Sequence, residues 1–264
     1  MQASLILNLS ALASLLPASA LAWKRPLARD GLFWTLLAVA VAGSAVAAVE
    51  KLAQGWLSSL SAALWLSVVA SLVMFILVSI VSRQGWRLAP LLLPYLFLLG
   101  IGAAVSEYVP PAAGTLVPDQ WTEIHVLVSI ATYGLLTLAA IAGLAVFLQE
   151  RMLKRRPAAP IAWLPAVADA ELLQIRLLAV SGIVLGLDLL TGAATQYMET
   201  RRLLEISHKT VFALTAFLVI VLLLLGHYRT GLRGRRAARM VLLAYLLLTL
   251  AYPGVKFVTD VLLA

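Results

Sequence analysis

The sequence predicts an all-α membrane protein, a polytopic bundle with about eight transmembrane helices. Composition is the first reason, because 62% of the 264 residues are hydrophobic and the mean hydropathy is +0.99, more than a soluble core needs. Length is the second, because apolar stretches of roughly 20 residues, enough to cross about 30 Å of hydrocarbon, recur along the whole chain. The third is that Lys and Arg gather in alternate loops between these stretches.

The first four apolar stretches occupy the part of the chain from residue 1 to residue 105. The first has no basic segment before it and is followed at once by Lys24, so it is predicted to be a retained helix and not a cleaved signal. Glu50, at the end of the second, is expected to reach water. The predicted spans are 4–23, 32–50, 60–82 and 88–105.

The other four stretches complete a single integral membrane domain, residues 1–264. Gly182 and Gly186 give the sixth stretch a small-residue face for close packing. The longest connection is expected from Arg151 to Arg176, with a short surface helix beginning near Asp169. The predicted spans are 125–149, 177–197, 209–227 and 238–258.

The basic residues fix the predicted orientation, because Lys and Arg accumulate in loops that stay in the cytoplasm. The first, third, fifth and seventh loops are therefore predicted to be cytoplasmic, and both termini to lie on the other side. These loops contain Lys24, Arg25, Arg29, Arg83, Arg87, Arg151, Lys154, Arg155, Arg156, Arg176, Arg229, Arg233, Arg235, Arg236 and Arg239. The same sorting explains the net charge of +8, so nucleic acid is not an expected partner and membrane lipids are.

The three histidines of the chain each lie at the edge of an apolar stretch. With the predicted topology, His125 and His208 begin helices at the outer surface, whereas His227 ends a helix at the cytoplasmic surface. His208 and His227 are separated by about 28 Å of helix at about 1.5 Å per residue, so they cannot share one metal ion. His125 and His208 could share a haem iron if their nitrogens approached to about 4 Å. The alternative for each is an interfacial histidine satisfied by water or headgroups.

The surroundings of His125 favour a ligand site. Pro118 and a candidate N-cap at Asp119 start its helix before the membrane does. Trp121, His125, Ser129 and Tyr133 then recur every four residues, which places them on one face of the helix. That face is expected to be turned towards protein, and it would suit a flat porphyrin. Trp121 is equally well explained as an interfacial belt residue.

Asp188 is an acidic residue within a predicted membrane span. On insertion scales such a residue costs roughly 2.5 to 3.5 kcal/mol at the bilayer centre, so a function is expected. It could bond a neighbouring helix, with Tyr133 or Thr191 as the partner. It could instead line a path for protons or a cationic substrate.

Three blocks of sequence in the second half of the chain stand out, namely 122–151, with Tyr133 inside, 207–238, and 252–257. The first two resemble the CcsA/CcmC cytochrome c assembly family, and the third resembles it more weakly. In plan the chain is most similar to the eight-helix, YpjD and HemX-type members. The resemblance covers residues 121–264, with residues 1–105 as four additional helices, and implies a helical bundle that handles haem. It also implies that His125 is an outer-face haem ligand and His227 a membrane-embedded one.

The chain departs from that family in its outer-face segments. The tryptophan-rich motif of the haem-transferring members is missing, since residues 195–206 contain no tryptophan. A second outer-face histidine expected after the last helix is also missing, which leaves His208 as the candidate to complete the pair. Arg201 or Arg202 could meet a haem propionate, or could simply belong to a solvated loop.

Haem binding with holding or passing of haem at the outer face is therefore the predicted function, and haem the predicted cofactor. The chain has no cysteine, so the thiol chemistry of covalent attachment would fall to other cytochrome c maturation proteins. We expect a bacterial inner-membrane protein that is not an enzyme. The alternatives are a small-solute or ion permease, or a membrane scaffold for a partner complex.

Overall fold

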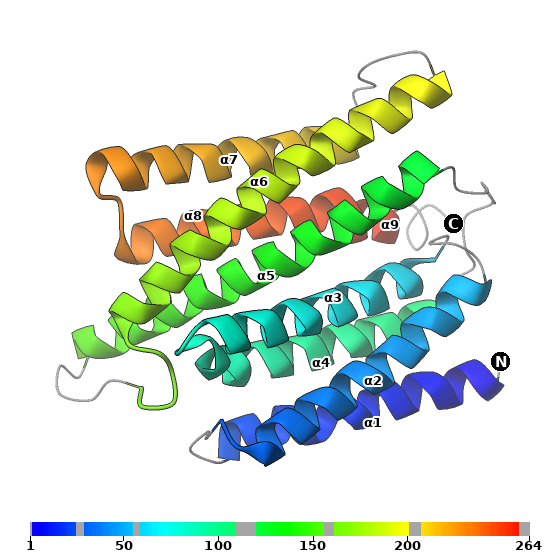
Figure 1. Cartoon of the computed structure of the whole chain (residues 1–264), viewed down its shortest axis with the longest axis horizontal. Coiled ribbons are helices and arrows are strands. Elements are labelled where there is room, and N and C mark those ends of the chain that lie inside the picture. Colours follow the sequence, from blue (N-terminus) through cyan, green and yellow to red (C-terminus); the bar gives the residue numbers. More distant parts are fainter. Residues whose placement is uncertain are drawn as a thin grey trace. The chain divides into compact units, whose positions relative to one another are not determined.

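A computed structural model describes residues 2–24, 29–54, 59–108, 120–155, 161–200 and 207–258. Its described residues contain helices and no strand, and eight helices are long and apolar enough to cross a membrane, as the sequence predicted. The chain divides into two compact units (Figure 1). Unit 1 is Met1–Leu116 with Lys256–Ala264, and unit 2 is Val117–Val255.

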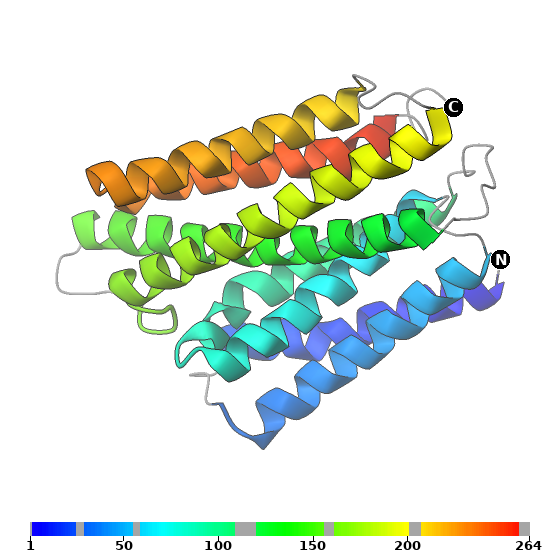
Figure 2. The ribbon, with the colours of Figure 1, turned by 45° about the horizontal axis from the view of Figure 1, so that its top comes forward.

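Unit 1 is a group of four helices in which each packs against two others. Helix α1 contacts α2 and α4, and α3 also contacts α2 and α4 (Figures 1 and 2). Small residues allow close approach, because a Cβ atom at Gly43 would collide with the Ser14 side chain of the neighbouring helix. The elements are α1 (Gln2–Lys24), α2 (Gly31–Gln54), α3 (Leu60–Val81), η1 (Gly85–Leu88), α4 (Ala89–Val105) and η2 (Ser106–Tyr108).

A polar cluster joins all four helices at one end of unit 1. Lys51, only 5% exposed, forms ion pairs with Glu107 and with Glu50, the latter at 3.0 Å. Asn8 donates a hydrogen bond to Glu107 and accepts one of 2.8 Å from Trp65 Nε1. Glu50 was expected to reach water, yet its Oε2 is buried and pairs with Lys51. The reason is that Lys51 is turned inwards to Glu107.

Burial of the Glu107 carboxyl raises its pKa, but hydrogen bonds from Lys51, Asn8 and Ser4 and the charge of Lys51 outweigh burial, so the pKa is below its ordinary value. The carboxylate is therefore the form that the folded unit favours. Since the cluster brings together α1, α2, α3 and the turn after α4, its electrostatic attraction stabilises the whole unit.

The substitution Glu107→Gln is expected to lower the stability of the protein in detergent by about 1 to 3 kcal/mol, because it leaves Lys51 buried beside a neutral partner. Thermal unfolding monitored by circular dichroism measures the effect. Glu123→Gln, which removes an exposed carboxylate, is the control and should leave the midpoint unchanged.

The pH dependence provides a second check on Glu107. Because its pKa is lowered on folding from 4.5, its stabilisation is complete above that value and is lost as the pH falls through the folded-state pKa. The difference between wild type and Glu107→Gln should therefore shrink in acid. A difference that stays constant down to the acid limit would contradict the ion-pair explanation.

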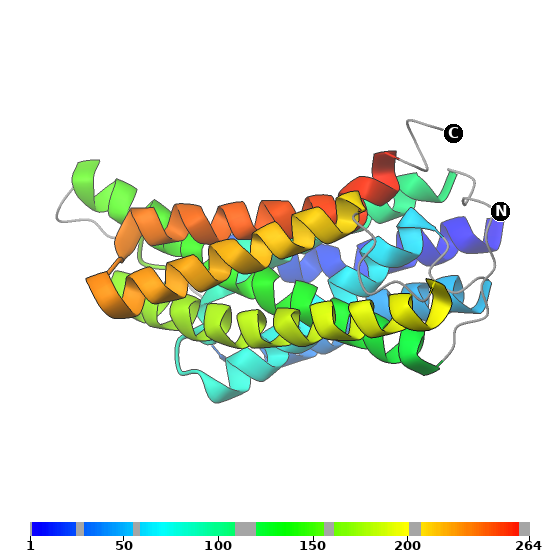
Figure 3. The same ribbon diagram turned by 90° about the horizontal axis from the view of Figure 1, so that it is seen from above.

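Unit 2 is a second group of four long helices. Helix α5 packs against α6 and α8, and α7 packs against the same two helices (Figures 1 and 3). Helices α5 and α7 are not a principal packing pair, although both begin at the same end of the unit. The elements are α5 (Gln120–Arg155), α6 (Val167–Thr200), α7 (His208–Thr230), α8 (Gly234–Thr249) and η3 (Leu250–Gly254). The short α9 (Val255–Phe257) begins at the last residue of unit 2, and its other residues belong to unit 1.

Helices α5 and α6 are longer than the sequence predicted, with 36 and 34 residues. The connection expected from Arg151 to Arg176 is therefore much shorter, and Asp169 belongs to the first turn of α6 and not to a separate surface helix. Gln149 holds the connection, donating to the carbonyls of Ile161 and Pro165 and accepting from Ile161 N–H. The predicted helices ended where the hydropathy of the sequence falls. The backbone hydrogen bonding of α5 and α6 continues beyond those residues.

The α7–α8 connection is tight. Gly231 has φ 68°, a left-handed conformation that favours glycine, and its N–H bonds to the carbonyl of His227 at 3.1 Å. Gly234 also has a positive φ, 65°, and its N–H donates to Glu171 of α6 at 2.7 Å. Arg235 N–H donates to Glu150 of α5 at 3.2 Å. Two carboxylates from neighbouring helices thus cap the start of α8.

Candidate functional site

His125 lies in the second turn of α5, with its ring against α6. Its Nδ1 is 3.1 Å from Thr191 Oγ1 and also 3.1 Å from a carboxylate oxygen of Asp188. The side chain of His125 is 31% exposed and that of Asp188 is 12% exposed. The ring is therefore held from one side by α6 while part of it remains accessible.

The hydrogen bonds of Thr191 determine which ring nitrogen carries the proton. Thr191 has one hydroxyl hydrogen, and it donates this to the backbone carbonyl of Asp188 at 3.0 Å. Thr191 Oγ1 can therefore only accept from His125, so Nδ1 is the N–H donor. The nearby Asp188 carboxylate favours a proton at the same nitrogen. In the neutral ring, Nε2 then has a free lone pair, the form that a metal ion requires.

Asp188 is the residue that the sequence marked as an acid inside the membrane. Ser129 of α5 donates a hydrogen bond to the same carboxylate oxygen that faces His125. Two side chains of α5, one turn apart, thus meet one carboxylate of α6. Tyr133, one of the two predicted partners of Asp188, instead forms a hydrogen bond with Tyr245. Thr191, the other, donates to the backbone carbonyl of Asp188 and accepts from His125.

Gly192 provides the space beside the His125 ring. A Cβ atom at this position would lie 3.0 Å from Cε1 and 3.4 Å from Nε2 of the ring. An alanine would therefore crowd the ring at Cε1, between its two nitrogens. The glycine lets the ring lie against the α6 backbone.

The predicted polar face of α5 becomes more exposed towards the start of the helix. Tyr133 is buried, 3% exposed, and its hydroxyl accepts a 3.0 Å hydrogen bond from Tyr245 of α8. Trp121 is 45% exposed. The predicted N-cap Asp119 lies outside the described residues, and α5 begins at the next residue, Gln120.

His227 has a similar ring arrangement near the other end of unit 2. Its Nδ1 is 3.0 Å from the backbone carbonyl of Leu232, which can only accept, so Nδ1 is again the donor and Nε2 has the lone pair. The ring also meets that of Tyr228 edge to face, with centroids 5.2 Å apart.

His208 is the first residue of α7 and is exposed. Ser207 caps this helix by accepting a hydrogen bond from Thr210 N–H at 3.3 Å. The starts of α5 and α7 lie at the same end of unit 2 (Figure 1), but those two helices do not pack closely, so pairing of His125 with His208 stays a prediction. Arg201 and Arg202, the predicted propionate contacts, lie outside the described residues.

Sequence reasoning missed the contact between His125 and Asp188. His125 lies 30 residues before the end of α5, whereas Asp188 and Thr191 lie 21 and 24 residues after the start of α6. Counting residues away from the connection therefore does not predict the contact. It depends on how the two helices pack against each other.

Comparison with known proteins identifies the family of this chain. The family model described as cytochrome C assembly protein matches residues 31–263. The chain belongs to the cytochrome c assembly family. The match begins in α2, and so extends further towards the start than the blocks that carry the resemblance in the sequence. Together with the eight apolar helices, membership makes this a multi-pass membrane protein of that family.

Individual relatives cover most of the chain. It is 47% identical over 270 residues, 100% of both chains, to an uncharacterized 28.8 kDa protein in a nifR3-like 5' region of Azospirillum brasilense. It is 29% identical over 198 residues to the inner membrane protein YpjD of Escherichia coli K12, covering 74% of this chain and 73% of the relative. No solved structure matches.

Proposed function

We propose that this protein binds haem through Nε2 of His125 and holds or passes it within cytochrome c maturation. The observation that carries the proposal is the ring geometry: Nδ1 is occupied by Thr191 and faces Asp188, so Nε2 has the lone pair. Family membership supports haem as the cofactor class, and an imidazole whose Nε2 has the lone pair is a side chain that would hold the haem iron.

The role of Asp188 in this proposal is to position the ring. A carboxylate beside the Nδ1–H of a ligating histidine fixes the tautomer and strengthens donation from Nε2. Ser129 holds the carboxylate in place from α5. Bound haem would supply a Lewis-acidic iron to this nitrogen, while the chain itself binds and orients. Trp121, one turn before His125 and partly exposed, is placed to pack against a porphyrin edge.

We further propose that the site faces outwards, with both termini on the same side, at the bacterial inner membrane. The distribution of Lys and Arg supports this orientation, and the likeness to the inner membrane protein YpjD supports the location. His208 is the proposed second ligand because α7 begins at the same end of unit 2 as α5. Since the chain has no cysteine, partner proteins would perform the thiol steps, and we do not propose an enzyme.

His125→Ala should abolish haem binding at this site, because it removes the imidazole that we propose binds the haem iron. Purified protein in detergent is titrated with haemin and the Soret band is recorded. The comparison is made in protein that already contains His227→Ala, so that haem bound at His227 does not contribute to the band. Imidazole added to the solution should restore the band in His125→Ala, and an unchanged band in that variant without imidazole would refute the assignment.

Asp188→Asn should lower haem affinity by about 10- to 100-fold, because the neutral amide no longer strengthens donation from Nε2. The same change should raise the midpoint potential of the haem that still binds, since a negative charge near its ligand is lost. Glu123→Gln removes an exposed carboxylate two residues before His125 and is the matched control. Equal shifts in both variants would show a general charge effect and contradict the positioning role.

The cysteine-free chain allows a direct test of orientation. Lys209→Cys, in the first turn of α7, should react with a membrane-impermeant maleimide on intact spheroplasts. Thr230→Cys, at the other end of the same helix, should react only after the membrane is permeabilised. The reverse pattern would place the start of α5 and His125 on the cytoplasmic side.

A further inference from the structure

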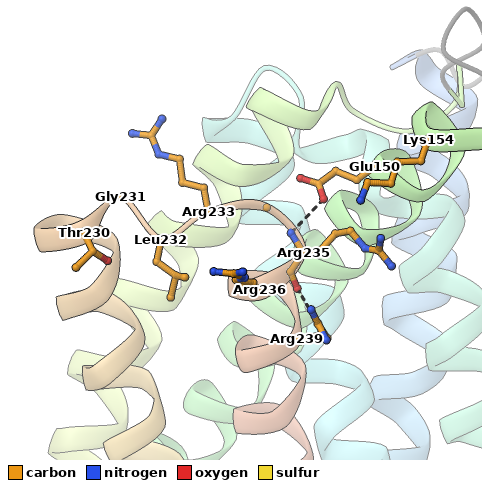
Figure 4. Close-up of a pocket in the computed structure, with 10 residues that line it drawn as sticks. Glu150, Lys154, Thr230, Gly231, Leu232, Arg233, Arg235, Arg236 and Arg239 are labelled. Atoms are coloured by element: carbon orange, nitrogen blue, oxygen red, sulfur yellow. Dashed lines mark hydrogen bonds between the residues drawn. The ribbon is translucent and has the colours of Figure 1, made fainter.

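A basic pocket lies at the end of unit 2 where α5 ends and α8 begins (Figure 4). Its volume is about 750 Å³. The lining includes a single acidic side chain, Glu150, and the other lining residues are neutral or basic. The cationic side chains are Lys154, Arg233, Arg235, Arg236 and Arg239.

Positive charge is in excess in this pocket, because five cationic side chains line it with one carboxylate. The carboxylates of Glu150 and Glu171 accept hydrogen bonds from the backbone N–H groups at the start of α8. Among the described residues, no ion pair joins a carboxylate to any of the five cations. Arg235 lies over the Phe147 ring at 5.0 Å, and its buried Nε has no hydrogen-bond partner in the part of the chain that the structure describes. The pocket therefore favours an anion that accepts several hydrogen bonds.

The exposed face of α8 indicates what kind of molecule contains that anion. Arg236 and Arg239 are exposed and line the pocket, and the next exposed positions of the helix are Leu243, Leu246 and Leu250. Their spacing of three and four residues places all five on one face. Two arginines thus stand at the end of a continuous apolar stripe that nothing in the described structure covers.

We propose that this pocket binds the phosphate group of an anionic phospholipid, whose acyl chain lies along the leucines of α8. Guanidinium groups match phosphate oxygens in pairs, which a diffuse attraction to the membrane surface does not require. The helix N-terminus is already capped, so the phosphate meets side chains rather than backbone N–H groups. The volume is within the range of small-molecule sites.

The test is native mass spectrometry of the full chain in detergent with equal amounts of phosphatidylglycerol and phosphatidylcholine of the same acyl chains. The wild type should retain phosphatidylglycerol at least tenfold over phosphatidylcholine. Arg236→Gln/Arg239→Gln should lose most of that preference. Arg151→Gln/Arg229→Gln removes two exposed arginines that do not line the pocket and should keep it.

Three outcomes would overturn the proposal. These are equal retention of the two lipids by the wild type, equal losses in the two double variants, and complete displacement of the lipid by inorganic phosphate, which would show a site for free phosphate. If the glutamine variant does not fold, Arg236→Lys/Arg239→Lys keeps the charge and should still reduce the preference, because lysine lacks the paired donors. An unchanged preference in the lysine variant would also count against a guanidinium site.

Discussion

Hydrocarbon offers no hydrogen bonds, so a charged side chain that lies between the helices of this protein is costly unless it finds a partner inside the protein. Unit 1 meets this constraint by joining Lys51 to Glu107, with Asn8 and Trp65 completing the network. Unit 2 meets it by placing Asp188 against Ser129 and His125. In each unit the requirement selects one rotation of the helices about their axes, since another rotation would leave a buried charge without a partner.

The same constraint prepares His125 for its proposed role. Asp188 needs donors, and the ring can satisfy it only through Nδ1, which leaves the lone pair on Nε2. A contact that stabilises the α5–α6 pair therefore also sets the tautomer of the ligand. His227 reaches the same tautomer by another route, through the carbonyl of Leu232 in the tight turn after α7. The two histidines implied by family resemblance thus share a ring state although their partners differ.

Hydropathy and charge were sufficient to predict eight membrane helices, because both signals are summed over many residues. The family was indicated instead by the resemblance of short sequence blocks, and the family model confirms it. The His125–Asp188 contact was not predicted, because it depends on the register of α5 against α6, and the connection between them is far shorter than expected. The state of His227 needs the left-handed Gly231 turn, which returns the chain so that Leu232 faces the ring. The burial of Glu50 and Lys51 was also not predicted, because it depends on an ion pair with Glu107, which is distant in sequence.

The central claim is that His125 presents Nε2 as a ligand because Thr191 and Asp188 hold its Nδ1. Nitrogen-15 NMR of histidine-labelled protein without haem, with His125→Gln used to assign the signal, tests this most directly. We predict that the ring proton lies on Nδ1 rather than on Nε2, and that this preference is lost in Thr191→Val/Asp188→Asn. A ring protonated on Nε2 in the wild type, or a tautomer unaffected by the double substitution, would contradict it.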